Sequence, residues 1–214
     1  MKPASTMAQF PQFEAFILVG GKSSRMGRDK VLLEIAGKPL LLRTAELVTP
    51  LVAGIALVGD PQLYGNFGYP ILADKWPNAG PLGAIATALE SARQPWTIIL
   101  ACDLPYLTGD WLAWLLDRTT KSTAGKTAGE SVDIFIPETA QGLEPLCAVY
   151  RTSCATAIAR ALDRGVRKVT HAFAGLKVEY ISESEWRPFS PDGHLFRNMN
   201  SPEDYQEARA HFED

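Results

Sequence analysis

Residues 97–102, TIILAC, would be apolar on both faces of a β-strand, and no other run constrains the fold as strongly. A strand with two apolar faces belongs inside a mostly parallel sheet that helices cover on both sides. Further strands are expected at 15–19, 54–59, 133–137 and 146–150, and helices from Pro39, near Leu82, and from Asp110, Ser153 and Ser201. This alternation predicts a three-layer α/β/α sandwich with a mostly parallel sheet.

The length of 214 residues suits one domain, which we place at 14–214 after a flexible N-terminal leader at 1–13. Residues 119–131, TTKSTAGKTAGES, are small and polar without periodicity, and predict a flexible loop. The leader is broken by prolines and lacks the apolar core of a signal peptide.

Composition argues against several classes of partner. A net charge of −3 gives no basic signature for nucleic acid or an anionic membrane, and no apolar run has the length of a membrane span. The three cysteines form no CxxC pair, which favours free thiols in a reducing compartment. We therefore expect a cytoplasmic enzyme.

In such sheets ligands bind beyond the carboxyl ends of the strands, so the residues after each strand carry the functional argument. The first strand is followed by GGKSSRMGRDK, residues 20–30. Its glycines let the backbone N–H groups approach a phosphate, and Arg25 and Lys30 have the chemistry to hold a polyphosphate. The loop is not a Walker A motif, because Phe16 stands where its first glycine is required, and the spacing of glycines 20, 21 and 27 does not fit a dinucleotide fingerprint.

Acidic and amide side chains follow the later strands. Asp103 directly follows the run at 97–102, where a carboxylate suits Mg²⁺ shared with phosphates; the alternative is that it only caps a turn. Asp74 precedes a Gly-Pro loop that opens a helix, a weaker indication. Asn198 and Asn200 precede the last helix, where a ligand contact and a capping role both remain open.

The sequence gives no indication of a covalent hydrolase. It has no Gly-x-Ser-x-Gly motif, and its three histidines are scattered without the spacing of metal ligands. Cys102 is expected to be a buried strand residue.

Residues 18–30, LVGGKSSRMGRDK, resemble the opening signature of the nucleotidyltransferases of the glycosyltransferase-A-like Rossmann class, with Val19 in place of alanine. Within that class the blocks ILADKWPNAGPLGAIATAL, ILACDLPYL, EPLCAVYR and FRNMNSPEDYQEA are similar to those of the molybdenum cofactor guanylyltransferases, in the same order. The resemblance covers about residues 15–212. It departs at Val58-Gly59-Asp60, where the family has an asparagine that contacts the nucleotide.

The resemblance implies a role for each matching residue. It implies that the nucleotide is contacted by Leu18, Val19, Gly20 and Gly21, and that the triphosphate is bound by Arg25 and Lys30. It implies that Asp74 helps to bind the guanosine and that Asp103 binds Mg²⁺. Asn198 and Asn200 would contact the phosphates or the acceptor. The implied catalytic residues are Arg25, Lys30 and Asp103.

The implied reaction transfers GMP from GTP to the molybdopterin cofactor and releases pyrophosphate. The same resemblance implies other cofactor-biosynthesis proteins and molybdoenzyme chaperones as partners. Two alternatives remain open: a cytidylyl- or sugar-phosphate nucleotidyltransferase of the same fold, and a nonenzymatic GTP-binding or cofactor-carrier protein.

Overall fold

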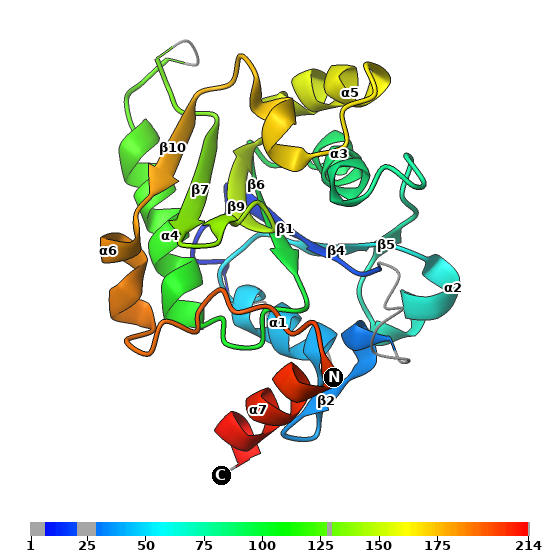
Figure 1. The fold of residues 1–214 in the computed structure, drawn as a ribbon. Helices are drawn as coiled ribbons and strands as arrows, with labels where there is room; N and C mark the ends of the chain where they lie inside the picture. The colour runs from blue at the N-terminus through cyan, green and yellow to red at the C-terminus, as the bar shows by residue number, and fades with distance from the viewer. Residues whose placement is uncertain (1–6, 21–28, 128–129, 214) are drawn as a thin grey trace.

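The computed structural model describes residues 7–20, 29–127 and 130–213, which form one mixed sheet between two layers of helices (Figure 1). The strand order is β10-β7-β9-β6-β1-β4-β5, and β8 pairs with β7 at its side. These strands are β1 Phe13–Leu18, β4 Ile55–Val58, β5 Ile71–Leu72, β6 Trp96–Ala101, β7 Ile134–Thr139, β8 Gly142–Leu143, β9 Cys147–Arg151 and β10 Val178–Ile181.

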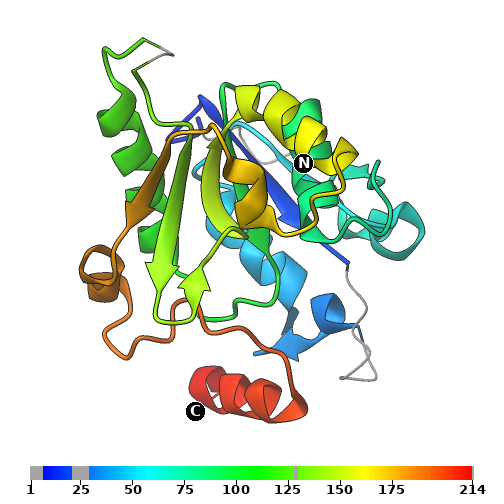
Figure 2. The ribbon, with the colours of Figure 1, turned by 45° about the horizontal axis from the view of Figure 1, so that its top comes forward.

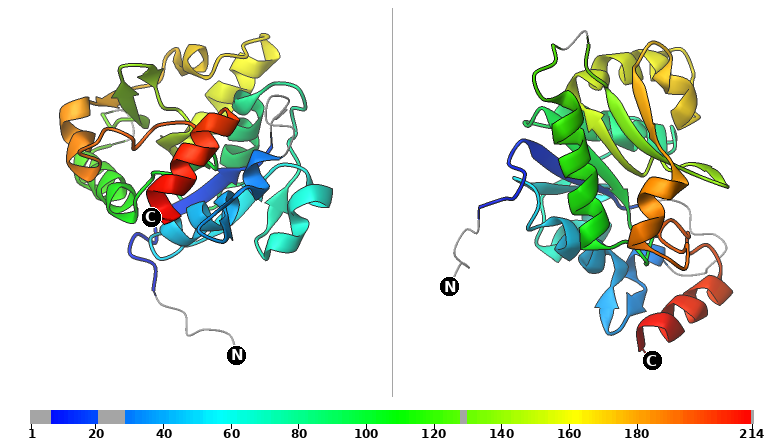
Figure 3. Two further views of the ribbon diagram at one scale, coloured as in Figure 1. Left: turned by 60° about the horizontal axis from the view of Figure 1, so that its bottom comes forward. Right: turned by 90° about the vertical axis from the view of Figure 1, so that its left-hand side faces the viewer.

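The sheet is covered on both faces, as the apolar strand at 97–102 predicts. Helices α1 (Leu40–Val48) and α4 (Gly109–Thr123) pack on one face, and α3 (Pro81–Ser91) and α5 (Ala155–Asp163) on the other. Figure 3 shows α4 lying along its face of the sheet. All six residues of β6 are buried, with Ile98 in the core beneath α4 and Ile99 in the core beneath α3. Each such buried aliphatic side chain contributes about 1.5–3 kcal/mol, which explains why the strand lies at the centre.

Shorter elements surround this sandwich. They are the hairpin strands β2 Glu34–Ile35 and β3 Lys38–Pro39, the helices α2 Pro61–Tyr64 and α6 Glu183–Trp186, and the 3₁₀ helices η1 Lys30–Leu32, η2 Gly65–Phe67, η3 Thr152–Cys154, η4 Val169–Phe173 and η5 Arg187–Phe189. The last helix, α7 (Pro202–Glu213), lies apart from the sheet beside β2 (Figure 2). The hydroxyl of Tyr205 on α7 donates to the carbonyl of Glu34 at 2.8 Å.

Strand directions bring the functional loops to one edge. Strands β6, β1, β4 and β5 are mutually parallel, so the segments after Leu18, Val58, Leu72 and Ala101 leave the sheet at the same edge. Strand β9 is antiparallel to both β6 and β7. Strand β7 therefore runs in the direction of β6, and the β7–β8 hairpin emerges at that edge as well.

Two predicted boundaries need correction. Phe10 and Phe13 belong to the folded domain and not to the predicted leader, because the amide of Phe10 donates to the carbonyl of Leu51 at 2.7 Å and Phe13 is a buried residue of β1. The predicted loop at 119–131 starts too early, since α4 continues through Thr123. Its threonine hydroxyls are satisfied within the helix: those of Thr119 and Thr120 each donate to the carbonyl four residues earlier at 2.9 Å.

The three cysteines of the chain are free and buried, which confirms the expectation that Cys102 is a buried residue. None of the helices within residues 7–20, 29–127 and 130–213 combines the length and apolar character needed to cross a membrane.

Candidate active site

The loop after β1 starts in the backbone conformation that its glycines predict. The amide of Val19 continues the sheet by donating to the carbonyl of Val58 at 2.9 Å, and Gly20 then adopts a φ of +143°. L-residues with a Cβ rarely adopt that φ, so glycine permits the turn. Gly21 and Arg25 lie outside the described residues.

Gly59 presses against this loop from the end of β4. A Cβ at Gly59 would lie 1.9 Å from the carbonyl oxygen of Val19, so only glycine fits. The next residue, Asp60, accepts from the amide of Gln62 at 2.8 Å and caps α2. At this departure from the family pattern, the structure therefore gives the aspartate a helix-capping role.

The far end of the loop is anchored through Asp29. Its Oδ1 accepts from the amide of Val31 at 3.1 Å, capping η1, and its Oδ2 accepts from the buried hydroxyl of Tyr64 at 2.5 Å. Burial, then this hydrogen bond, raise the pKa of Tyr64, so the hydroxyl stays a donor. Asp29 is therefore held between η1 and α2, and it sets the direction of Lys30.

Lys30 points into a cluster with Asp103 and Asn200. Its Nζ donates to Oδ1 of Asn200 at 2.6 Å and lies 4.0 Å from Oδ2 of Asp103. The three residues come from η1, the end of β6 and the segment before α7. The structure thus brings together three of the residues singled out in the sequence.

Asp103 follows β6 at the carboxyl edge, as predicted. Burial raises the pKa of its carboxyl group, and the nearby Lys30 opposes that shift. Its carbonyl accepts from the amide of Met199 at 2.9 Å, which fastens the C-terminal segment beside the carboxylate. Among the described residues there is no group of three His, Cys, Asp or Glu side chains that could hold a metal. A hard cation at Asp103 would fill its coordination from phosphate oxygens and water, the mode common for Mg²⁺.

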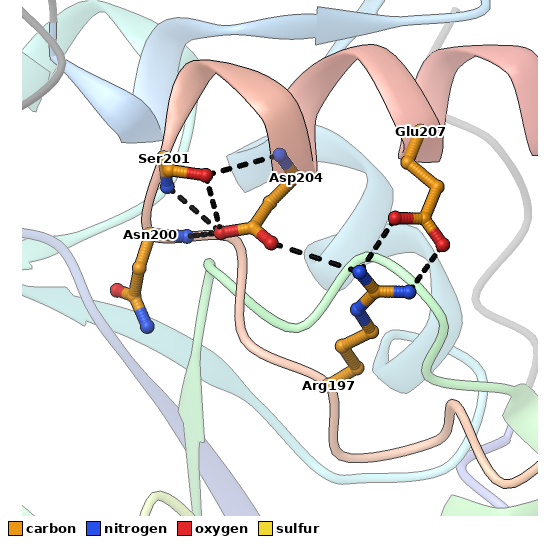
Figure 4. Close-up of polar contacts among 5 residues, drawn as sticks. All are labelled: Arg197, Asn200, Ser201, Asp204 and Glu207. Carbon is orange, nitrogen blue, oxygen red and sulfur yellow. Dashed lines mark hydrogen bonds and ion pairs between the residues drawn. The ribbon is translucent and has the colours of Figure 1, made fainter.

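Helix α7 holds Asn200 from the other side (Figure 4). Oδ2 of Asp204 accepts from the amides of Asn200 at 2.9 Å and Ser201 at 2.8 Å, while the amide of Asp204 donates to Oγ of Ser201. This is a reciprocal capping box at the helix start. Arg197 adds a two-pronged ion pair with Glu207 and lies 3.8 Å from Asp204. The segment carrying Asn200 is therefore tied to α7 by its backbone and by charge.

Asp74 lies at the same edge, beyond β5. Its Oδ1 accepts from the amide of Trp76 at 2.9 Å and from Oγ1 of Thr87 on α3 at 3.2 Å. These bonds order the loop that opens α3. The structure places Asp74 on the β5 flank, with its hydrogen bonds directed to α3 and to its own loop.

An open cleft of about 600 Å³ lies on the opposite flank. It runs between the β7–β8 hairpin and the segment before α7, and its polar lining comprises Thr139, Gln141, Glu144, Glu183, Arg187, His194, Arg197, Asn198 and Asn200. Asn198 and Asn200 thus line a cleft, and Asn200 also reaches Lys30. Glu144 also lines the cleft and was not singled out from the sequence. Its position between the apolar runs at 133–137 and 146–150, close to the edge that carries Asp103, could have pointed to it.

Residues 15–178 match the family described as the MobA-like NTP transferase domain. The chain belongs to this family. This MobA-like transferase is 35% identical over 194 residues to "Probable molybdenum cofactor guanylyltransferase" from Peptoclostridium acidaminophilum, covering 90% of this chain and 86% of the relative. The likeness confirms the family and the enzyme class, a nucleotidyltransferase.

Solved structures agree with the fold of this MobA-like transferase. The crystal structure of molybdopterin-guanine dinucleotide biosynthesis protein A from Archaeoglobus fulgidus superposes with a TM-score of 0.76 at 25% identity, covering 92% of this chain and 97% of that chain. The 2-C-methyl-D-erythritol 4-phosphate cytidylyltransferase from Thermus thermophilus has a TM-score of 0.66 at 14% identity, covering 93% and 98%. At that identity the likeness concerns the fold alone.

Proposed function

We propose that the protein transfers GMP from GTP to the terminal phosphate of molybdopterin, forming the molybdopterin guanine dinucleotide and releasing pyrophosphate. The observation that carries this proposal is the cluster of Lys30, Asp103 and Asn200. Asp103 follows β6, which lies in the sheet between β1, β4 and β5 on one side and β9 and β7 on the other, and Asn200 belongs to both the cluster and the cleft lining.

In this reaction an oxygen of the acceptor phosphate attacks the α-phosphorus of GTP. A new P–O bond forms there, and the P–O bond to the bridging oxygen of the β-phosphate breaks, so that pyrophosphate leaves with its electron pair. A phosphate monoester is already largely ionised at neutral pH, because its second pKa is about 6. The attacking group therefore needs no general base.

The remaining task is to neutralise and align two anions. Lys30 supplies a positive charge to the phosphates, and its hydrogen bond to Asn200 holds the ammonium group at one place. By resemblance, the backbone at Gly20 and Gly21 and the side chain of Arg25 would complete the phosphate contacts. Mg²⁺ held by Asp103 would supply further neutralisation of phosphate charge. Asp74, on the β5 flank, is assigned to the guanosine part.

Nucleotide choice separates this proposal from its first alternative. Pyrophosphate release in the presence of molybdopterin should be fastest with GTP among GTP, CTP, UTP and ATP. The shared fold of the cytidylyltransferase makes CTP the sharpest comparison. Preference for CTP would replace the guanylyl assignment by a cytidylyl one.

The second alternative, a cofactor carrier, is separated by Asp103→Ala. As a metal ligand, Asp103 is expected to be worth at least about 100-fold in turnover. A carrier would show no turnover to lose. Asp117→Ala is the matched control, because Asp117 is a half-exposed carboxylate on α4 that forms an exposed ion pair with Lys121 four residues on. If the Asp103→Ala variant kept full activity, Asp103 would not be the Mg²⁺ ligand.

A further inference from the structure

Glu144 is a rigidly placed carboxylate on the wall of the open cleft. It follows β8 directly, its amide donates to the carbonyl of Pro137 at 3.0 Å, and its own carbonyl accepts from the amide of Cys147 at 3.1 Å. Both neighbouring strands therefore fix its backbone, so the side chain is presented to the cleft from a firm support.

The carboxylate of Glu144 is poorly compensated by its surroundings. Within the described residues its hydrogen bond comes from the hydroxyl of Thr139, at 3.3 Å to Oε1. The cleft's other carboxylate, Glu183, forms an ion pair with Arg187. Burial raises the pKa of Glu144, the hydrogen bond from Thr139 opposes that shift, and the charge of Asp103 adds to it. A half-buried carboxylate without a cationic partner in a cavity is a strong candidate for a ligand contact.

The rest of the cleft lining carries hydrogen-bond donors. Asn198 and Asn200 bring amide groups, His194 an imidazole, and Arg187 and Arg197 guanidinium groups that are paired with Glu183 and Glu207. These donors suit phosphate oxygens, whereas the carboxylate of Glu144 repels them and accepts N–H donors. A ligand that suits the whole lining carries an anionic group at one end and a pair of N–H donors at the other.

The pterin ring of molybdopterin has such a donor pair in its 2-amino group and N3–H. The two N–H bonds point the same way, with a spacing that suits the two oxygens of one carboxylate, as in other paired charge-assisted hydrogen bonds. We propose that Glu144 binds the 2-amino-4-oxopyrimidine edge of the acceptor pterin and selects for it. This inference rests on the proposed function, since it assumes that the cleft receives the acceptor.

The first test compares Glu144→Gln with the wild type at saturating GTP. Loss of a charge-assisted bond pair should raise KM for molybdopterin roughly 10- to 100-fold. KM for GTP and the Mg²⁺ concentration for half-maximal rate should change by less than about twofold. Glu46→Gln is the matched control, because Glu46 is an exposed carboxylate on α1, outside the cleft lining, that pairs with Lys38; the expected change is below about threefold.

Two other outcomes would overturn the inference. An unchanged KM for molybdopterin in Glu144→Gln would show that the carboxylate does not contact the acceptor. A shift in Mg²⁺ dependence with unchanged KM for molybdopterin would make Glu144 part of the metal site near Asp103. A wild type that forms no dinucleotide with GTP and molybdopterin would instead defeat the proposed function itself.

A second test needs no turnover. Pterin (2-amino-4-oxopteridine) and lumazine (2,4-dioxopteridine) differ in that lumazine presents a carbonyl acceptor in place of the amino donor. Direct binding to the wild type should favour pterin at least about fivefold, and Glu144→Gln should lose that preference, because its amide can also donate to the lumazine carbonyl. Equal binding of the two rings by the wild type, or binding of neither, would count against Glu144 as the selecting group.

Discussion

Lys30 and Asn200 are 170 residues apart in the sequence, yet Nζ of one lies 2.6 Å from Oδ1 of the other. The bond ties the C-terminal segment to the start of η1. It also places the ammonium group 4.0 Å from the carboxylate of Asp103, so one amide side chain orients the charge that we propose to bind the phosphates.

The bond between Lys30 and Asn200 predicts strong coupling between their substitutions. Asn200→Ala should lower kcat about tenfold, and Lys30→Ala should lower kcat/KM for GTP by at least about 100-fold, because the charge itself is lost. The double variant should be hardly worse than Lys30→Ala, since the amide has nothing left to orient. Steady-state kinetics of all four proteins measures the coupling. Additive losses would show that the two side chains act independently.

Tyr64 is predicted to stabilise the site through Asp29. Tyr64→Phe removes one hydrogen bond to a carboxylate and should cost roughly 1–3 kcal/mol in the free energy of unfolding by urea. KM for GTP should rise severalfold, because Lys30 follows Asp29 directly. Tyr180→Phe is the control, since Tyr180 lies on β10 with 54% of its surface exposed, and it should cost less than about 0.5 kcal/mol. Unchanged stability of Tyr64→Phe would contradict this anchoring role.

Helix α7 is predicted to act on the site through its capping box. Asp204→Ala should lower the free energy of unfolding by about 1 kcal/mol and lower kcat severalfold, because the backbone of Asn200 loses its carboxylate partner. Arg209→Gln breaks an exposed ion pair with Glu213 on the same helix and should change both quantities little. If Asp204→Ala changed kcat no more than Arg209→Gln does, the capping box would have no influence on the site.

Glu144 should reduce stability at neutral pH. Its folded-state pKa is raised, mainly by burial, so its ionised form is disfavoured in the folded protein relative to the unfolded chain. The folded state is therefore free of this penalty below the ordinary pKa of 4.5 and acquires it as pH rises through the folded-state pKa. Glu144→Gln, which keeps an oxygen for Thr139, should melt at a higher temperature than the wild type near pH 7. The difference should vanish toward pH 4. A difference that stays constant between these pH values would show that ionisation is not its cause.

Much of the architecture followed from local pattern. The apolar run at 97–102 predicted a central strand covered on both faces, and β6 is that strand. The start of α7 was predicted from Ser201 and the acidic first turn, and its capping box is present. The C-terminal end of α4 was not predicted, because its threonines are small and polar like the residues of a loop. In the structure the hydroxyls of Thr119 and Thr120 donate to carbonyls of the same helix, so these residues fit a helical end.

The sequence by itself determined the α/β alternation, the glycine turn at Gly20 and the placing of Asp103 at a strand end, because strand period and backbone φ are local properties. Only the tertiary structure decided that Asn200 meets Lys30, that Tyr64 anchors Asp29 and that Glu144 lines the cleft. These relationships depend on strand order and direction, above all on antiparallel β9 between β6 and β7. Strand pairing over long sequence separations depends on packing across the whole sheet, and the local pattern of residues does not encode it.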